Sequence, residues 1–426
     1  MTRPLTVLLP TDAFPPRCGG AGWSAHALAA ALIASGRQAL ALVPQRGRGI
    51  RGEPTLGVPA IRIGYREWPL PFLRNYSRHE RFWPQFAAVI EQAAHEYSGP
   101  LVIHAQHVQA APAAVIAGRR LGVPVVITVR DHWPWDYFAT GLHGDRVPYP
   151  RQTWASLAVD LTARLGPLRG AAALPAIGYL RAHLARRQAY LRAADAVVAV
   201  SGYIAERLAT IVSPAKIHRI PNLVDLAMVD ETIARAPQAI DQQPFLLFVG
   251  KLERNKGAHL LVDIFGELRR LVGEAVRLPP LLIAGDGVLR NEIAHGMARV
   301  GVSVRFLDWV AHDEILRLSA RCMLFLYPSA WGEPLSRTLI EASACGAPVI
   351  AMPTGGTGDI LSNGVNGVLA PTTAHFARQI VHLLAHPDER HALGRAARRN
   401  AEQQFAAGVV VPQFIQLYRS LLGMPG

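Results

Sequence analysis

The chain alternates short apolar runs with segments whose apolar residues recur every three or four positions. In the first half, the apolar runs are rich in aliphatic and β-branched residues. They fall at residues 5–10, 38–44, 101–106, 123–129 and 196–201. Runs of this kind are typical of strands buried on both faces of a parallel sheet, with the helical segments serving as crossovers. We therefore expect the first half to form an open, mostly parallel α/β sheet.

The same alternation restarts in the second half of the chain. Its apolar runs fall at residues 244–250, 278–285, 302–307, 323–329 and 347–352. Helical patterns such as Gly257 to Leu271 separate them, and both patterns fade between Pro221 and Gln243. The sequence thus predicts two successive α/β domains, residues 1–220 and 221–408.

One stretch of the first domain departs from this alternation. Residues 133–170 contain four Pro, four Gly and three Trp, and the stretch reads as irregular. Long irregular insertions in a compact domain are often binding loops. Position alone leaves two interpretations open, a substrate-binding loop and a structural excursion.

Composition narrows the class of protein. Of 426 residues, 50% are hydrophobic, and 44 Lys and Arg against 31 Asp and Glu give a formal charge of +13. This excess favours anionic partners such as phosphates or an acidic membrane surface, and no groove-reading motif supports nucleic acid. Cys18, Cys322 and Cys345 are too scattered for a disulfide framework or a cysteine metal site. With no signal-peptide or membrane-spanning pattern, we expect a cytoplasmic protein, soluble or peripheral at the inner face of the membrane.

The most informative segment is PSAWGEPLSRTLIEASACGAPVIA at residues 328–351. Pro334 suits the turn before a helix and Ser336 its start, so Glu333 should lie in a loop and Glu341 two turns into the helix. One carboxylate can then face a sugar and the other a ribose. The backbone N–H groups of Leu335 and Ser336 would point outward at the positive end of the helix dipole, where a phosphate can bind. The alternative is that both glutamates are solvated surface charges.

Two further loops follow strands of the second domain. FVGKLERNKG (248–257) places Lys251 and Lys256 at the carboxyl end of a strand, where ligands of open α/β sheets bind. Two lysines there could neutralise a diphosphate, although an ordinary solvated loop would look the same. AGDG (284–287) contributes Gly285, which permits close backbone approach.

The first domain opens with a glycine pair directly before a helix. Gly19 and Gly20 could let the backbone touch a phosphate or sugar, although such a pair is more often an ordinary turn. The sequence around them is not GxGxxG, and no acidic residue follows the next strand at the dinucleotide offset. A nicotinamide-dependent oxidoreductase, which would also use two such domains, is therefore disfavoured.

Taken in order, these motifs resemble one family, the retaining GT-B glycosyltransferases of family four (glycosyl transferases group 1), related to glycogen and sucrose synthases. The resemblance covers nearly the whole chain. It includes the PPRCGGAGWSAHALAAAL, IHAQ, TVRDHWPWD, ADAVVAVSGY, IPNLVD, GKLERNKG, AGDG, FLDWV, WGEPLSRTLIEA and GGTGDILSNGVNGVLAP segments. It implies two Rossmann-like domains facing across a cleft, the first on the acceptor side and the second binding the nucleotide sugar.

The resemblance also implies roles for single residues. Glu333 would hold hydroxyls of the transferred sugar, Glu341 the ribose, and Lys251 and Lys256 the diphosphate. Gly20 would approach the phosphate from the other domain, and the backbone of Trp309 and Val310 would lie near the base. As a hexosyltransferase-like enzyme (EC 2.4) of polysaccharide biosynthesis, it would need no cofactor and no metal beyond its UDP- or GDP-linked substrate.

Several positions depart from the family pattern. Arg130 stands where a His commonly touches the donor sugar, with His132 two residues further on, and Lys251 stands where Arg is common. Asp308 replaces a frequent Gly and Asp359 a frequent Glu. These departures leave the donor less defined, but they preserve both glutamates and both cations. The acceptor, whether glycan, lipid-linked or a small molecule, is not identified by any motif.

Three readings stay open at this stage. A nucleotide-sugar sensor without catalysis would carry nearly the same residues. His104 and His107, at a strand end, could be structural or could face the cleft, and the basic helix of residues 177–194 could contact anionic lipid or simply pack on the sheet.

The resemblance further implies that residues 409–426 pack back on the first domain, because Val409 to Leu422 carries an apolar stripe that needs a partner. The alternative is packing on the second domain alone.

Overall fold

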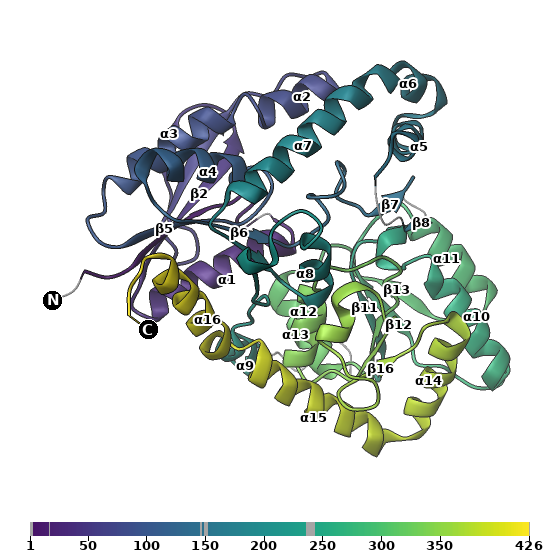
Figure 1. The fold of residues 1–426 in the computed structure, drawn as a ribbon. Coiled ribbons are helices and arrows are strands. Elements are labelled where there is room, and N and C mark those ends of the chain that lie inside the picture. Colours follow the sequence, from purple (N-terminus) through teal and green to yellow (C-terminus); the bar gives the residue numbers. More distant parts are fainter. Residues whose placement is uncertain (1–2, 17, 145–146, 149–151, 236–242, 426) are drawn as a thin grey trace. The chain divides into compact units, whose positions relative to one another are not determined.

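The computed structural model describes residues 3–16, 18–144, 147–148, 152–235 and 243–425. Its contacts divide the chain into two compact units. Unit 1 consists of residues 1–140, 151–223 and 407–426, and unit 2 of residues 141–150 and 224–406. Each unit is an α/β fold in which helices surround a central sheet (Figure 1).

Unit 1 is built on an eight-stranded sheet with the order β10-β9-β6-β5-β1-β2-β4-β3. Every pairing is parallel except that of β3 with β4. The strands are β1 (Thr6–Pro10), β2 (Gln38–Arg46), β3 (Ile50–Gly52), β4 (Ala60–Tyr65), β5 (Leu101–Ala105), β6 (Val125–Val129), β9 (Ala196–Ala199) and β10 (Ile217–Arg219). Strand β1 has β2 on one side and β5 on the other, so the order in which strands are added to the sheet reverses at β1. The loops that follow β1, β5 and β6 therefore meet at one edge of the sheet.

The helices of unit 1 connect its strands, except α16, which comes at the end of the described chain. They are α1 (Gly20–Ala34), α2 (Pro71–Arg78), α3 (Trp83–Ala94), α4 (Ala110–Leu121), α5 (Trp154–Leu165), α6 (Pro167–Ala172), α7 (Ile177–Ala193), α8 (Gly202–Leu208) and α16 (Ala407–Leu421), with short 3-10 turns at η1 (Leu174–Ala176) and η2 (Pro214–Lys216).

Unit 2 carries a six-stranded, entirely parallel sheet with the order β13-β12-β11-β14-β15-β16. Its strands are β11 (Leu246–Val249), β12 (Leu281–Ala284), β13 (Val304–Phe306), β14 (Leu324–Tyr327), β15 (Val349–Ala351) and β16 (Val368–Leu369). Its helices are α9 (Leu226–Ala234), η3 (Arg254–Lys256), α10 (Leu260–Val272), α11 (Arg290–Arg299), α12 (His312–Arg321), α13 (Arg337–Ala344), η4 (Gly355–Asp359), α14 (Thr373–Ala385) and α15 (Pro387–Gln404). A two-stranded ribbon, β7 (Leu142–His143) with β8 (Val147–Pro148), groups with this unit.

Helix α16 is part of unit 1 although it follows all of unit 2 in sequence. Its buried residues Val410, Phe414 and Tyr418 share one core with Leu28 of α1 and Leu9 of β1, and α16 lies beside α1 (Figure 1). The Tyr418 hydroxyl is 2.7 Å from Nδ1 of His104. The described chain therefore returns to its first unit after completing the second.

The sequence predicts all ten apolar runs correctly as strands, but it misses the sheet strands β3, β4, β10 and β16 and misjudges two further segments. The stretch 133–170 is not irregular throughout: α5 begins at Trp154 behind a capping box of Thr153 and Ser156, and α6 follows it. The joint at 221–243 contains α9, whose N-cap is Asp225. Helix α10 also begins three residues later than predicted, because Gly257 adopts a φ of +71° and closes the preceding turn.

Candidate functional site

Loops at the carboxyl edge of the unit 2 sheet are held in close contact by glycines. Gly257 has a φ of +71°, and a Cβ built there would lie 1.7 Å from the Pro328 carbonyl oxygen. A Cβ on Gly285, whose φ is +145°, would lie 2.0 Å from the Gly250 carbonyl oxygen. Only glycine fits either position. The close approach that the sequence indicated at Gly285 is thus an approach to the neighbouring loop.

This packing brings Lys256 and Glu333 together, from the loops that follow the adjacent strands β11 and β14. The Lys256 Nζ is 2.6 Å from Oε2 of Glu333, and the Trp331 Nε1 donates to the same oxygen at 2.6 Å. The Lys256 ammonium also lies 5.2 Å from the centre of the Trp331 ring. The result is a compact triad in which a carboxylate is fixed by two donors.

Electrostatics keep Glu333 ionised. Burial by itself would raise its pKa, since burial disfavours the charged form, but the Lys256 ammonium and the hydrogen bonds to the carboxylate lower the pKa below its ordinary value. Glu333 is therefore a poor proton donor at neutral pH and a good acceptor for hydroxyl groups.

Helix α13 begins beside this triad with Ser336 as its N-cap, the side chain accepting from the Leu339 N–H at 3.2 Å. Leu335 is buried immediately before it. Glu341 lies on this helix and is buried, with its Oε1 2.8 Å from Nε2 of His312 and 2.7 Å from Nε of Arg337. Burial raises the pKa of Glu341, but the Arg337 guanidinium and His312 lower it overall. Sequence reasoning missed His312 and Arg337 as its partners.

The remaining residues predicted for unit 2 are more exposed. The Lys251 side chain is 68% exposed, with its Nζ 3.9 Å from Oε1 of Glu253, and Trp309 is 80% exposed while Val310 is half-buried. Asp308 has a φ of +56°. This explains why a glycine would suit that position, and Asp is among the residues that tolerate the left-handed conformation.

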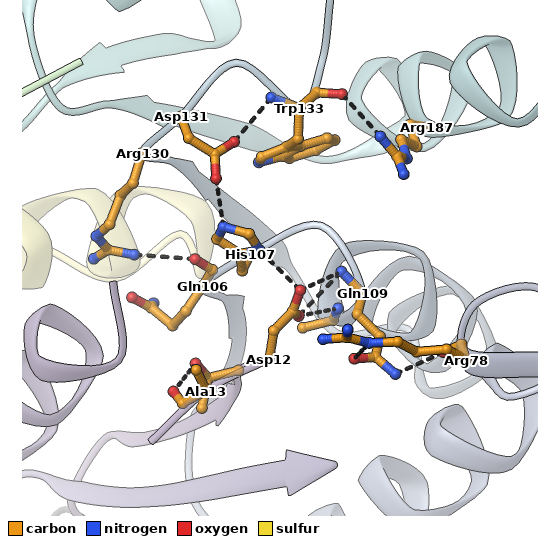
Figure 2. Close-up of polar contacts among 12 residues, drawn as sticks. Asp12, Ala13, Arg78, Gln106, His107, Gln109, Arg130, Asp131, Trp133 and Arg187 are labelled. Carbon is orange, nitrogen blue, oxygen red and sulfur yellow. Dashed lines mark hydrogen bonds and ion pairs between the residues drawn. The ribbon is translucent and has the colours of Figure 1, made fainter. Parts of the chain in front are cut away.

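In unit 1, three side chains form a chain of contacts that the sequence did not reveal (Figure 2). His107 Nδ1 lies 2.8 Å from Oδ2 of Asp12, and His107 Nε2 lies 2.6 Å from Oδ2 of Asp131. Each of the three stands two residues beyond the end of its strand, β1, β5 or β6, and these strands are neighbours in the sheet. This common position, two residues beyond a strand end, was the signal in the sequence that could have identified the three residues. It can be used only when the order of the strands in the sheet is known.

The carboxylates set the charge of His107. Burial would lower its pKa, but Asp131 and Asp12 raise it to about 10, so the ring is an imidazolium at neutral pH. Asp12 also accepts from the backbone N–H groups of Gln109 and Ala110 at the start of α4. Since both ring nitrogens are engaged, this trio fixes three loops. His104, by contrast, is a buried residue with Thr128 2.6 Å from its Nε2.

A cavity of about 370 Å³ opens beside this trio within unit 1. Its lining includes Asp12, Arg78, His107, Trp133 and Arg187. Trp133 belongs to the segment that the sequence indicated as a binding loop or a structural excursion.

The predicted residues of unit 1 lie at the same edge of its sheet. Gly19 is the N-cap of α1 in an extended conformation with no side-chain cap, and Gly19 and Gly20 are exposed. Arg130 donates to the Asn222 side chain at 2.9 Å. It also donates to the Gln106 carbonyl at 3.1 Å (Figure 2). His132 is buried against the rings of Trp135 and Tyr203.

Metal-ligand spacing occurs at one place in the part of the chain that the structure describes. His382, His386 and Glu389, at the junction of α14 and α15, offer ligand atoms within 4.8 Å of one another, and all three are exposed. In the same described ranges, no helix is long and apolar enough to cross a membrane.

Two family models match consecutive parts of the chain: "Glycosyltransferase Family 4" over residues 18–228 and "Glycosyl transferases group 1" over residues 229–400. Glycogen synthase of Mycobacterium tuberculosis is 30% identical over 54% of this chain and 55% of its own. D-inositol 3-phosphate glycosyltransferase 1 of Catenulispora acidiphila is 27% identical over 79% of this chain and 76% of its own. The structure of HepE from Anabaena in complex with UDP-glucose aligns with a TM-score of 0.66 at 20% identity, covering 97% of this chain and 99% of that one.

The fold is that of the GT-B class, two α/β units each built on a mainly parallel sheet. Within that class, the chain belongs to the family-four glycosyltransferases, also called glycosyl transferases group 1. The matched region spans about half the length of several curated relatives, 48 to 55%.

Proposed function

We propose that this protein is an active glycosyltransferase that moves a hexose from a nucleotide-diphosphate sugar to an acceptor, with retention of anomeric configuration. The observation that carries the proposal is the Lys256–Glu333 pair beside the N-terminus of α13. An ionised carboxylate can accept hydrogen bonds from sugar hydroxyls, while an ammonium and free helix N–H groups favour a phosphate. These groups lie together at the edge of the sheet where α/β folds bind ligands.

The other predicted donor contacts complete the proposed site. Lys251, exposed on the same loop as Lys256, would join it on the diphosphate, and the N–H groups of Leu335 and Ser336 would cap the phosphate. Glu341 would bind the ribose, and the exposed Trp309 with Val310 would flank the base. Gly19, Gly20 and Arg130 of unit 1 and Gly285 of unit 2 are proposed as backbone or side-chain contacts to the same donor.

The proposed mechanism assigns the proton transfer to the substrate. The leaving phosphate oxygen takes the acceptor proton on the face of attack, which preserves configuration. The protein contributes preorganised positive charge where negative charge develops on the diphosphate. No metal is required in this proposal, because Lys251, Lys256 and the α13 N-terminus supply that charge.

The names of relatives support a nucleotide-sugar donor. HepE binds UDP-glucose, and names among the relatives include glycogen synthase and D-inositol 3-phosphate glycosyltransferase. We propose a UDP- or GDP-linked donor without a further cofactor, and a glycan, lipid-linked or small-molecule acceptor.

Turnover of a donor panel tests the proposal. Incubated with UDP- and GDP-linked hexoses without acceptor, the protein is expected to release nucleoside diphosphate from one of them slowly, and EDTA should leave the rate unchanged. Nucleotide-sugar binding without any turnover, with and without acceptor mixtures, would instead indicate a sensor. Loss of turnover in EDTA, restored by magnesium or manganese, would contradict the metal-independent mechanism.

We also propose peripheral contact with an anionic membrane, through a surface different from the one the sequence suggested. Helix α7 buries its stripe residues Ile177, Leu180 and Leu191 together with Arg187. More than half of the large exposed hydrophobic side chains in the described ranges instead lie on α2, α5, α6 and their flanks. They are Trp68, Leu70, Leu73, Tyr76, Trp154, Val159, Leu168 and Leu174.

The elements that carry these side chains pack together and are basic. Phe72 of α2 packs against the core formed by α5 and α7. The exposed arginines Arg74, Arg164 and Arg169 lie on α2, α5 and α6, while Arg81 follows α2 and Arg181 lies on the neighbouring α7. The acidic residues of these segments, Glu67, Glu80 and Asp160, are buried or half-buried. Apolar side chains ringed by arginines suit the headgroup region of an anionic bilayer.

Vesicle sedimentation checks this contact. The protein is expected to sediment with vesicles containing phosphatidylglycerol and not with pure phosphatidylcholine, and Leu168→Glu, at an 88% exposed position, should weaken binding severalfold. The matched control is Val276→Glu, at a 47% exposed position of unit 2. Equal binding of both vesicle types, or equal losses in both variants, would contradict the proposal.

A further inference from the structure

Two residues that line the cavity of unit 1 each have a buried N–H group without an acceptor in the protein. Trp133 is 1% exposed and Arg187 is 4% exposed, yet the Trp133 Nε1 and the Arg187 Nε have no hydrogen-bond partner. Both groups are donors only. Leaving such a group unpaired in a buried place is destabilising, so the arrangement suits a ligand that brings acceptor oxygens.

The two arginines of the cavity also lack a carboxylate. Among the described residues, no Asp or Glu lies within ion-pair distance of Arg187 or Arg78. Arg187 donates from Nη1 to the Tyr137 carbonyl at 3.2 Å and stacks over the Tyr137 ring at 5.0 Å. Arg78 makes only a long contact of 3.5 Å from its Nε to the Gln109 side chain.

The acidic residue that lines the cavity does not compensate this charge. Asp12 is already engaged by the His107 imidazolium and by two backbone N–H groups of α4. The cavity therefore presents two guanidinium groups without an ion-paired carboxylate, and buried charges in proteins are normally paired. Burial lowers the pKa of Arg187, although Tyr137, Asp131, Asp136 and Glu80 at longer range act in the opposite direction.

We propose that this cavity binds an acidic group of the acceptor, a phosphate or a carboxylate, between Arg187 and Arg78. The inference rests on the proposed function and names the acceptor class. A guanidinium matches the planar or tetrahedral oxygens of such a group through paired hydrogen bonds. The Trp133 indole N–H donates to a further acceptor oxygen, and a volume of about 370 Å³ suits a small ligand.

Binding can be measured without any transfer reaction. The full chain, with its donor site occupied by excess UDP, is titrated with inorganic phosphate, glucose 6-phosphate and glucose, and the melting temperature is followed. We expect the two phosphates to raise the melting temperature and glucose to leave it unchanged. Arg187→Gln and Arg78→Gln should each weaken phosphate binding about tenfold or more.

Arg51→Gln is the matched control, because Arg51 is an exposed arginine of β3 in the same unit. Should Arg187→Gln fail to fold, as judged by circular dichroism, the half-buried Arg78 still decides the question. Equal phosphate binding by the wild type, the folded cavity variants and the control would overturn the proposal.

The origin of the acidic group is resolved by a transfer assay with two acceptor sets. A water-soluble hexose phosphate and vesicles containing phosphatidylinositol are compared, each against its uncharged counterpart, and faster transfer to either acidic set supports the inference. Faster transfer to uncharged acceptors only would overturn the inference while leaving the glycosyltransferase activity intact. Failure of nucleotide release with every donor would instead contradict the proposed function.

Discussion

Replacing Lys256 with alanine is expected to lower turnover by about a hundredfold or more, by analogy with removing one preorganised donor from a site of developing negative charge. The loss should fall on kcat, because the charge that Lys256 compensates develops on the leaving diphosphate. In the ligand-free protein, Lys256 also neutralises the buried Glu333, 2.6 Å away. The variant should therefore melt at a lower temperature as well, since a buried carboxylate loses its partner.

Arg254→Ala is the matched control, because Arg254 lies in the same 3-10 turn and its substitution also removes one positive charge. Lys251→Ala should also impair turnover, and the double variant should lose less than the product of the two single losses if both lysines act on one diphosphate. Near-normal steady-state rates in both single variants would refute the assignment.

Truncation before Val409 is expected to unfold unit 1 although it removes no predicted donor contact. The deletion takes away five buried side chains of α16, namely Val410, Val411, Phe414, Leu417 and Tyr418. A milder change, Phe414→Ala, should cost about 3–5 kcal/mol of unfolding free energy, because it removes a large buried ring. Urea denaturation followed by circular dichroism measures it.

Gln416→Ala serves as the control on the exposed face of the same helix. Phosphate-dependent stabilisation, which depends on the unit 1 cavity, should disappear in the truncated chain. A truncated protein that unfolds with wild-type cooperativity and stability would show that α16 is dispensable to unit 1.

The sequence predicts the two sheets well because their strands are buried on both faces, so each apolar run stands out. It predicts less well where local signals are weak. Helix α9, with nine residues and an Asp cap, lies in a stretch where both the strand and the helix patterns fade. Helix α5 is masked by the Pro and Gly residues that flank it.

Contacts between residues far apart in the sequence were the hardest to predict. Glu333 could be singled out from its own segment, but its bond to Lys256 depends on β11 and β14 being neighbours. His107 was a candidate, while Asp12 and Asp131 were not, because their meeting requires the order β6-β5-β1. The proximity of the two cavity arginines could not be predicted at all. Arg78 ends α2 and Arg187 lies within α7, and nothing in the helical patterns indicates that they line the same cavity.

The return of α16 to unit 1 has a consequence for the order of events during biosynthesis. The apolar surface that α16 covers includes Leu9 of β1 and Leu28 of α1 and is made early. Its cover, α16, emerges from the ribosome only after residues 224–406. Unit 2 is continuous apart from a short ribbon, so it can complete its core during synthesis, whereas unit 1 cannot. The nascent chain thus carries an open apolar surface for the time needed to translate an entire second unit, a natural place for a chaperone to act.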